Sequence, residues 1–261
     1  MILDDLVRAT RDNMVHRQFE VPATILEAKA RQRIIKKTFP FEKALRQRAI
    51  SVIAEIKQAS PSQGQIIPQD QFDYLSIAHA YDEAGVDLIS VLTEEKYFKG
   101  SIAILKAVAQ TVKTPILRKD FIIDDYMIYE AIVAGAKVIL LIVAILEDEQ
   151  LRRYLKLADE LGLSAIVEAH NEKEIHRAIA AKGRIIGINN RNLKDFSVDF
   201  NNTKRLRELI PEDILVISES GIKTRADVTL LEDLQVNGIL VGETFMKSKD
   251  KMKMIKTLIG Q

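Results

Sequence analysis

Charged side chains recur where short apolar segments of this sequence end. Glu55 and Lys57 close the first such segment, and Lys119 and Glu168 close two later ones. Glu55 and Lys57 are two residues apart, so in a β-strand both point to the same face. Burying a charge is costly unless it is paired or used, so several such groups meeting in one place would indicate general acid–base catalysis. The predicted catalytic residues are Glu55, Lys57, Lys119 and Glu168, together with the polar Asn189, which ends a further apolar segment.

Polar residues after two further segments extend this set. Asn189 is followed at short range by Arg191, and Glu219 is followed directly by Ser220. Side chains of these types hold hydroxyl and anionic groups of a substrate. Arg191, Glu219 and Ser220 are therefore predicted to contact the substrate.

Two glycine-containing segments, 218–222 and 241–244, suit a phosphate site. Glycine lets the backbone approach a ligand closely, although it is equally usual in any tight turn. The loop at 59–64 can add a serine hydroxyl, with Gly64 as a hinge. The predicted phosphate-binding residues are Ser60, Gly221, Gly242 and Glu243, the last through its backbone N–H with its side chain turned away.

Eight short apolar segments alternate with amphipathic stretches from residue 51 onward, a pattern typical of a parallel sheet covered by helices. The segments are Ser51–Lys57, Asp87–Leu92, Pro115–Lys119, Lys137–Val143, Leu163–Glu168, Arg184–Asn189, Asp213–Ser218 and Asn237–Gly242. An open doubly wound sheet is the alternative, but neither G-x-G-x-x-G nor G-x-x-x-x-G-K-[ST] occurs. The sequence therefore predicts an α/β protein with a (βα)8 TIM barrel. In this fold active sites lie at the carboxyl ends of the strands, where the residues above fall.

The first 48 residues have helical spacing and little strand character. Pro22 precedes Ala-Thr-Ile-Leu-Glu, which suits the first turn of a helix. With no linker to divide the chain, we predict one domain over 1–261, in which 1–48 is an N-terminal helical extension of the barrel.

Composition limits the classes of partner. Lys and Arg number 38 against 37 Asp and Glu, a net charge of +1, which gives no electrostatic footprint for nucleic acid or an anionic membrane. There is no cysteine, the N-terminus lacks the basic and apolar start of a signal peptide, and the apolar run 138–146 is too short to span a bilayer. The four histidines form no H-E-x-x-H pair. We expect a cytoplasmic protein that binds a small phosphorylated molecule, with no metal.

Several blocks of the sequence together resemble the indole-3-glycerol-phosphate synthase family. They are Glu55-Ile-Lys57, Ala59-Ser-Pro-Ser-Gln-Gly64, Ser90-Val-Leu-Thr-Glu-Glu-Lys-Tyr-Phe98 with Gly100-Ser101, Leu117-Arg-Lys-Asp-Phe121, Val167-Glu-Ala-His170, Gly187-Ile-Asn-Asn-Arg-Asn-Leu193, Ser218-Glu-Ser-Gly-Ile222 and Val241-Gly-Glu-Thr-Phe-Met246. They occur in family order from the first strand to the last. The first forty residues match only loosely.

The resemblance implies a decarboxylating and dehydrating ring closure in tryptophan biosynthesis, without metal or organic cofactor. It makes Lys119 the general acid of ring closure, for which we expect a pKa depressed by Lys57 and partial burial. Lys57 would pair with the substrate carboxylate, and Glu168 would transfer protons during dehydration. Which lysine acts at which step stays open, as does whether Phe98 and Phe121 contact the aromatic ring or only pack. His170 is expected at the surface or behind the site.

Two rival interpretations remain at this level. One is another phosphate-binding barrel enzyme, such as a phosphoribosylanthranilate isomerase or a ribulose-phosphate epimerase, although the cysteine of the first and the metal ligands of the second are not found. The other is a catalytically silent barrel that binds or regulates, which would not need Glu55, Lys57, Lys119 and Glu168 together. We expect a monomer, with at most weak association with other enzymes of the pathway.

Overall fold

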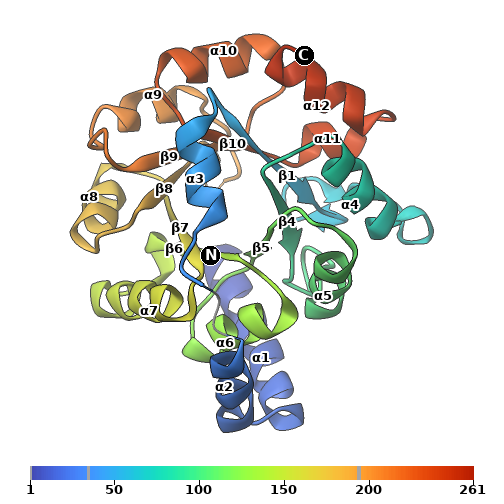
Figure 1. The fold of residues 1–261 in the computed structure, drawn as a ribbon, viewed down its shortest axis with the longest axis vertical. Helices are drawn as coiled ribbons and strands as arrows, with labels where there is room; N and C mark the ends of the chain where they lie inside the picture. Colours follow the sequence, from blue (N-terminus) through green and yellow to red (C-terminus); the bar gives the residue numbers. More distant parts are fainter. Residues whose placement is uncertain (1, 34–35, 193–194) are drawn as a thin grey trace.

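A closed barrel of parallel strands forms the centre of the protein (Figure 1). The computed structural model describes residues 2–33, 36–192 and 195–261. The barrel strands are β1 (Ser51–Ile56), β4 (Leu88–Leu92), β5 (Ile116–Lys119), β6 (Val138–Ile142), β7 (Ser164–Ala169), β8 (Ile185–Asn189), β9 (Leu215–Glu219) and β10 (Gly238–Val241). Each strand pairs with its neighbours in chain order, and β1 pairs with β10 to close the ring. The predicted TIM barrel is confirmed, with one strand in each of the eight predicted segments.

Helices surround the barrel as an outer ring (Figure 1). They are α4 (Tyr74–Glu83), α5 (Ile102–Thr111), α6 (Asp125–Ala134), α7 (Asp148–Leu161), α8 (Glu172–Ala180), α9 (Asn201–Arg207), α10 (Arg225–Asp233), α11 (Glu243–Lys247) and α12 (Lys251–Ile259). Short elements interrupt the connections: the hairpin β2 (Ala59–Ser60) with β3 (Gly64–Gln65), and the 3-10 turns η1 (Gln69–Gln71) and η2 (Val143–Ile145). Side-chain caps such as Ser101 on α5 and Thr224 on α10 fix where helices begin.

Strand alternation separates two apolar layers. In β5, Leu117 packs inside the barrel, whereas Ile116 packs in the layer between the strands and the helices. Successive strand residues point to opposite faces, so Lys119 follows Leu117 inward and Arg118 follows Ile116 outward. One strand thus presents a cation to each side of the barrel wall.

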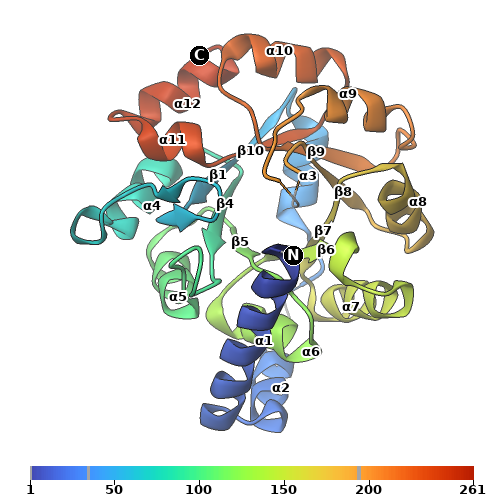
Figure 2. The ribbon, with the colours of Figure 1, turned by 180° about the vertical axis from the view of Figure 1, so that it is seen from behind.

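The N-terminal helices are α1 (Ile2–Glu20), α2 (Ala23–Gln32) and α3 (Pro40–Gln47). α3 lies in front of the barrel in Figure 1, and in the reverse view of Figure 2 α1 runs from the edge of the barrel, where its N-terminal end lies, down past α6 beside α2. At the strand starts, Leu45 of α3 faces Gly238 and Glu42 accepts a hydrogen bond from Ser164 Oγ (2.9 Å). At the strand ends, Leu6 of α1 joins the barrel interior. The predicted helical extension is confirmed; residues 1 and 34–35 lie outside the described residues.

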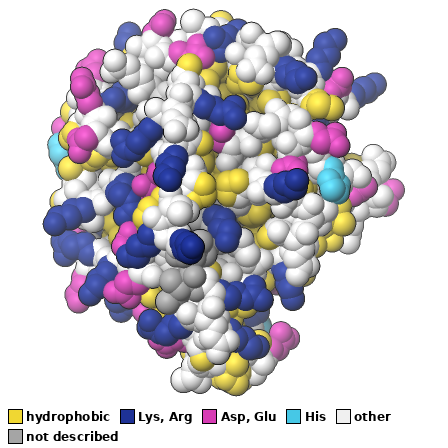
Figure 3. Space-filling view, in the orientation of Figure 1, with side chains coloured by type: hydrophobic (Ala, Val, Ile, Leu, Met, Phe, Trp, Pro, Cys, Tyr) yellow, Lys and Arg dark blue, Asp and Glu magenta, His cyan; other side chains and the backbone are white. Residues whose placement is uncertain are grey.

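The side of the molecule seen in Figure 3 carries basic and acidic side chains interspersed with one another. This pattern agrees with the near balance of Lys and Arg against Asp and Glu over the whole chain. Within the described ranges, no helix is both long enough and apolar enough to cross a membrane.

The packing of α3 against the strand starts, here called the α3 seal, can be tested through Leu45. Its side chain is fully buried against the strand starts, so Leu45→Ala is expected to lower the free energy of unfolding by about 2–5 kcal/mol. Urea unfolding followed by circular dichroism measures the change. Phe19→Ala, on a side chain that is 82% exposed, serves as control and should change it by less than about 0.5 kcal/mol. A Leu45→Ala effect as small as the control's would contradict the assignment of α3 as a seal.

Candidate active site

A cavity of about 890 Å³ opens at the carboxyl ends of the barrel strands. Its volume falls within the range of pockets that hold small molecules. All of the predicted site residues line it: Glu55, Lys57, Ser60, Lys119, Glu168, Asn189, Arg191, Glu219, Ser220, Gly221, Gly242 and Glu243. The barrel therefore brings together, in one place, residues separated by up to 188 positions in the sequence (243 minus 55).

Strand pairing sets the level at which each charged residue stands. Asn189 is the register partner of Glu219, and Glu168 is the partner of Ile142. Lys119 ends β5 opposite Leu92. Because neighbouring parallel strands end at the same edge, these side chains meet in the barrel mouth.

Lys119 lies at the centre of the charged groups. Its Nζ is 3.3 Å from Glu168 Oε2 and 3.6 Å from Glu219 Oε2. At the end of β1, two strands away from β5, Lys57 Nζ donates to Glu55 Oε1 at 2.6 Å. The mouth thus holds two ammonium groups, each beside its own carboxylates.

The pKa of Lys119 is raised, not depressed, and the prediction from the sequence is wrong on this point. Burial alone lowers the pKa of the Lys119 ammonium, but the carboxylates of Glu168, Glu219 and Glu55 outweigh burial and raise it above its ordinary value. Lys57, expected to repel Lys119, is instead paired with Glu55. Lys119 is accordingly protonated throughout the physiological range.

Glu168 and Glu219 have pKa values displaced in opposite directions. Burial and the negative charge of Glu168 raise the pKa of Glu219 to about 8, although Lys119 acts against this. Burial also disfavours the ionised form of Glu168, but Lys119 and His170 outweigh it and hold its pKa below the usual range. At neutral pH one carboxyl is therefore ionised and its neighbour is protonated.

His170 lies behind Glu168. This is one of the two positions that the sequence predicted for it. Its Nε2 is 3.3 Å from Glu168 Oε1, and its Nδ1 is 3.0 Å from Glu174 Oε2. Burial lowers the pKa of His170, but the two carboxylates raise it overall to about 10. An imidazolium in this position fixes the Glu168 carboxylate and favours its ionised form.

Two glycines make room for the buried carboxylates. A Cβ on Gly187 would overlap Glu219 Oε1, and a Cβ on Gly242 would overlap Glu55 Oε1 and approach Lys57 Nζ. Any larger residue at either position would displace a charged group. Gly242 was predicted only as a phosphate-binding residue and Gly187 was not predicted as a site residue, because the sequence does not show which side chain crosses a given strand.

The loop after β9 has a tightly specified backbone. Ser220 and Gly221 both have positive φ, 72° and 86°, a conformation that favours glycine and is strained for serine. Ser220 Oγ donates to Asn189 Oδ1 at 2.9 Å, and the same oxygen accepts from Arg191 N at 2.9 Å. Asn189 thus ties two loops together at the rim of the cavity.

The β2–β3 hairpin after β1 also lines the cavity, where the sequence predicted a loop hinged at Gly64. Ser60 Oγ contacts Ser62 Oγ (3.3 Å) and accepts from Gln63 N (3.3 Å), and Gly64 has φ 64° at the turn. Glu243 forms an ion pair with Lys247 at 2.6 Å. Its carboxylate therefore has a cationic partner beside the predicted phosphate position.

Apolar side chains also line the cavity, and those on or near β4, β5 and β6, together with Leu6 of α1, are called the apolar wall. They are Leu6, Leu92, Phe98, Phe121, Leu140 and Ile142. The rings of Phe98 and Phe121 lie 6.2 Å apart at 44°. Phe121 belongs to the barrel core, Phe98 packs against that core, and both rings line the cavity. Whether they contact the aromatic ring of the substrate stays a prediction. Leu6 was not predicted, because the first forty residues carry no recognisable motif.

Among residues 2–33, 36–192 and 195–261, no group of three or more His, Asp or Glu side chains is arranged to hold a metal ion. The carboxylates in the mouth face lysine and histidine instead.

Comparison with known proteins agrees with this geometry. The family model described as indole-3-glycerol phosphate synthase matches residues 3–258. The indole-3-glycerol phosphate synthase of Leuconostoc mesenteroides is 65% identical over 261 residues, covering 100% of both chains. That of Lacticaseibacillus paracasei is 51% identical over 255 residues, covering 98% of this chain and 97% of the relative.

The chain belongs to the indole-3-glycerol phosphate synthase family. The resemblance inferred from the sequence is thereby confirmed, and with it the enzyme class, a decarboxylating lyase of tryptophan biosynthesis. Among solved structures, the 3-hexulose-6-phosphate synthase of Salmonella typhimurium has a TM-score of 0.65 at 10% identity, covering 80% of this chain and 96% of that one. Such a likeness shows the shared barrel fold.

The raised pKa of Glu219 predicts a pH dependence. With a pKa of about 8, Glu219 is neutral at pH 7 and gains a negative charge as the pH rises through 8. An anionic substrate is then repelled, so kcat/KM is expected to fall above about pH 8. Glu219→Gln, which cannot ionise, should lose this alkaline limb. A pH profile of kcat/KM for both proteins makes the measurement, and an identical limb in the variant would refute the assignment.

Proposed function

We propose that this cavity converts 1-(2-carboxyphenylamino)-1-deoxyribulose 5-phosphate to indole-3-glycerol phosphate, carbon dioxide and water by general acid–base catalysis. The observation that carries the proposal is the 3.3 Å approach of Lys119 Nζ to Glu168 Oε2 in the barrel mouth. A fixed ammonium beside an ionised carboxylate supplies the proton donor and the proton acceptor that ring closure and dehydration require.

Lys119 is the proposed acid of ring closure. The ring carbon that bears the carboxylate attacks the ribulose carbonyl carbon, and the carbonyl oxygen takes a proton from Lys119. The raised pKa of Lys119 keeps the ammonium charged until an alkoxide-like oxygen, itself strongly basic, develops beside it. Electrostatic stabilisation of that oxygen by a fixed charge is accordingly the main contribution of Lys119.

Lys57 is the proposed partner of the substrate carboxylate. When the bond to the carboxylate breaks, carbon dioxide leaves and its bonding electrons return to the ring. The ring nitrogen then expels the hydroxyl group as water, with a proton from Lys57 or Lys119, and Glu168 accepts a carbon-bound proton to complete the indole. Glu55, at 2.6 Å from Lys57 Nζ, orients that ammonium.

The remaining residues are proposed to bind and orient the substrate. The backbone at Gly221, Gly242 and Glu243, with the Ser60 hydroxyl, holds the phosphate. Arg191, Glu219, Ser220 and Asn189 line the path of the ribulose hydroxyls, and the apolar wall receives the aromatic ring. Fixing both ends of a flexible chain brings the reacting carbons together, an effect worth up to roughly 7–11 kcal/mol.

The decisive experiment is a fluorescence assay for indole-3-glycerol phosphate, with the carboxyphenylamino substrate and no added metal. Appearance of the product supports the proposal, and its absence with a folded protein refutes it. The rival enzymes are tested in parallel with phosphoribosylanthranilate and with a pentulose phosphate. Family membership over residues 3–258 disfavours both rivals and a silent barrel.

We further propose that the protein acts as a monomer in the cytoplasm, with at most weak association with other enzymes of the pathway. All of the predicted site residues come from one chain, so the proposed chemistry needs no second copy. Sedimentation of the purified protein tests the monomer.

Substitution of Lys119 tests its role directly. Lys119→Ala removes the proposed acid and should lower kcat by about 10²–10⁴-fold, while substrate binding stays measurable by fluorescence quenching. Lys137→Ala provides the control, because Lys137 precedes β6 at the opposite end of the barrel; its kcat should equal that of the wild type. Undiminished turnover in Lys119→Ala would exclude Lys119 as the acid.

The phosphate is expected to anchor the substrate. Charge-assisted hydrogen bonds each contribute about 1.5–3 kcal/mol, so loss of two or more of them should make a dephosphorylated substrate react at least roughly 100-fold less efficiently. The measurement compares kcat/KM for the two substrates. Ser60→Ala is predicted to lower the ratio of kcat/KM for the phosphorylated substrate to kcat/KM for the dephosphorylated one, because it weakens binding of the phosphorylated substrate alone. Equal efficiency of both substrates in the wild type would contradict a phosphate site.

A further inference from the structure

Arg118 is adjacent to Lys119 in β5, but its side chain lies outside the cavity, in the layer between the barrel and α6. The side chain has 0% exposure, which is rare for an arginine. A buried guanidinium is costly unless its N–H groups are paired, so its surroundings indicate what it holds in place.

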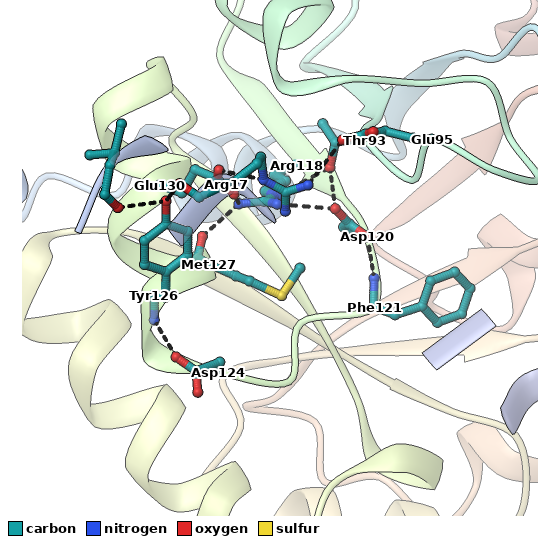
Figure 4. A network of polar contacts seen from close by, with 11 residues as sticks. Arg17, Thr93, Glu95, Arg118, Asp120, Phe121, Asp124, Tyr126, Met127 and Glu130 are labelled. Atoms are coloured by element: carbon teal, nitrogen blue, oxygen red, sulfur yellow. Dashed lines mark hydrogen bonds and ion pairs between the residues drawn. The ribbon is translucent and has the colours of Figure 1, made fainter. Parts of the chain in front are cut away.

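The Arg118 guanidinium has a partner on each of its nitrogens (Figure 4). Nε donates to Thr93 Oγ1 at 3.1 Å, and Nη2 donates to Asp120 Oδ2 at 3.1 Å. Nη1 donates to the backbone oxygen of Met127 at 2.7 Å and lies 2.8 Å from Glu130 Oε2. The planar fork therefore joins β5 to the loop after β4 and to α6 at the same time.

These partners enclose the backbone of the catalytic strand end. Thr93 N donates to the carbonyl oxygen of Lys119 at 3.1 Å, and Thr93 Oγ1 donates to Asp120 Oδ2. Asp120 Oδ1 accepts from Phe121 N at 2.8 Å. The Arg118 contacts thus fix the peptide units from which Lys119 and Phe121 project into the cavity.

The same network reaches the N-terminal extension. Glu130 Oε1 accepts from Arg17 Nε of α1 at 2.7 Å, and Arg17 Nη1 lies 3.0 Å from Glu95 Oε1 on the loop after β4. Tyr126 OH also donates to the backbone oxygen of Arg17 at 3.0 Å. The Glu130 carboxylate is therefore shared between a guanidinium of the barrel and one of the extension.

We propose that Arg118 is a positioning residue that sets the direction of the Lys119 ammonium and the Phe121 ring, with Arg17 as the outer end of the same network. This inference rests on the proposed function, in which Lys119 is the acid. Lysine in place of Arg118 keeps the charge but has no planar fork and cannot hold Thr93, Asp120 and Glu130 together.

The principal test is Arg118→Lys. A misplacement of about 1 Å in an acid can cost roughly 100-fold in rate, so kcat is expected to fall by about that factor. KM should change by much less than kcat, because the proposed phosphate and carboxylate ligands stand on other strands and only the Phe121 contact is disturbed. A crystal structure of the variant should show the distance from Lys119 Nζ to Glu168 Oε2 lengthened from 3.3 Å.

Two further variants separate positioning from general stability. Arg184→Lys alters another arginine with two carboxylate partners, a partly exposed one at the strand starts, where Arg184 pairs with Glu42 and Asp159 at 3.0 Å each; its kcat should not change. Glu130 does not line the cavity, and Glu130→Gln leaves Arg118 in place. In this variant kcat should fall by about tenfold at unchanged KM. This second variant keeps the test available if Arg118→Lys does not fold.

An unchanged kcat in a folded Arg118→Lys or Glu130→Gln protein overturns the inference. So does a loss of kcat that only follows the unfolded fraction and occurs equally in Arg184→Lys. Failure of the proposed function is a separate result, because the wild type would then form no indole-3-glycerol phosphate. The crystallographic position of Lys119 in the variant would still report whether Arg118 holds it.

Discussion

A lysine ammonium buried beside Glu168 and Glu219 needs compensating negative charge, and the Glu168 carboxylate on β7 supplies it. Removing charges from water costs several kcal/mol for each ion even after relaxation, so the mouth does not tolerate every carboxyl in its ionised form. At neutral pH Glu219 stays protonated and Glu168 is ionised, because Lys119 and His170 both stabilise the ionised form of Glu168. The protonation pattern of the site follows from this balance, and the proposed acid and base follow from the pattern.

The balance depends on backbone shape as much as on charge. Gly187 and Gly242 leave the space that Glu219 and Glu55 occupy, so the strands themselves determine where the carboxylates can stand. The apolar wall lowers the local polarity and strengthens each electrostatic contact in the mouth. A substrate with an aromatic ring and two anionic groups matches a cavity lined by both apolar and charged side chains.

Most of the fold and the membership of the site could be predicted from the sequence, because both depend on strand periodicity. Eight apolar segments and the polar residues at their ends suffice to place Lys119 and Glu168 in one mouth. The raised pKa of Lys119 could not be predicted, since it depends on Glu168 and Glu219 standing 3.3 Å and 3.6 Å away, distances set by the barrel's closure. Leu6 could not be predicted for a similar reason, because α1 carries no motif and reaches the cavity only through tertiary packing.

The two faces of β5 show how the barrel separates the residues that hold the site in place from those that face the substrate. Lys119 turns inward to carboxylates in reach of a ligand, whereas Arg118 turns outward to Asp120 and Glu130, where it is fully buried. Since adjacent residues of a strand share one rigid backbone, immobilising the outer cation restricts the inner one. Apolar packing by Leu45 at the strand starts stabilises the opposite end. A fixed acid can thus be kept in a mouth whose own side chains must stay open to a substrate.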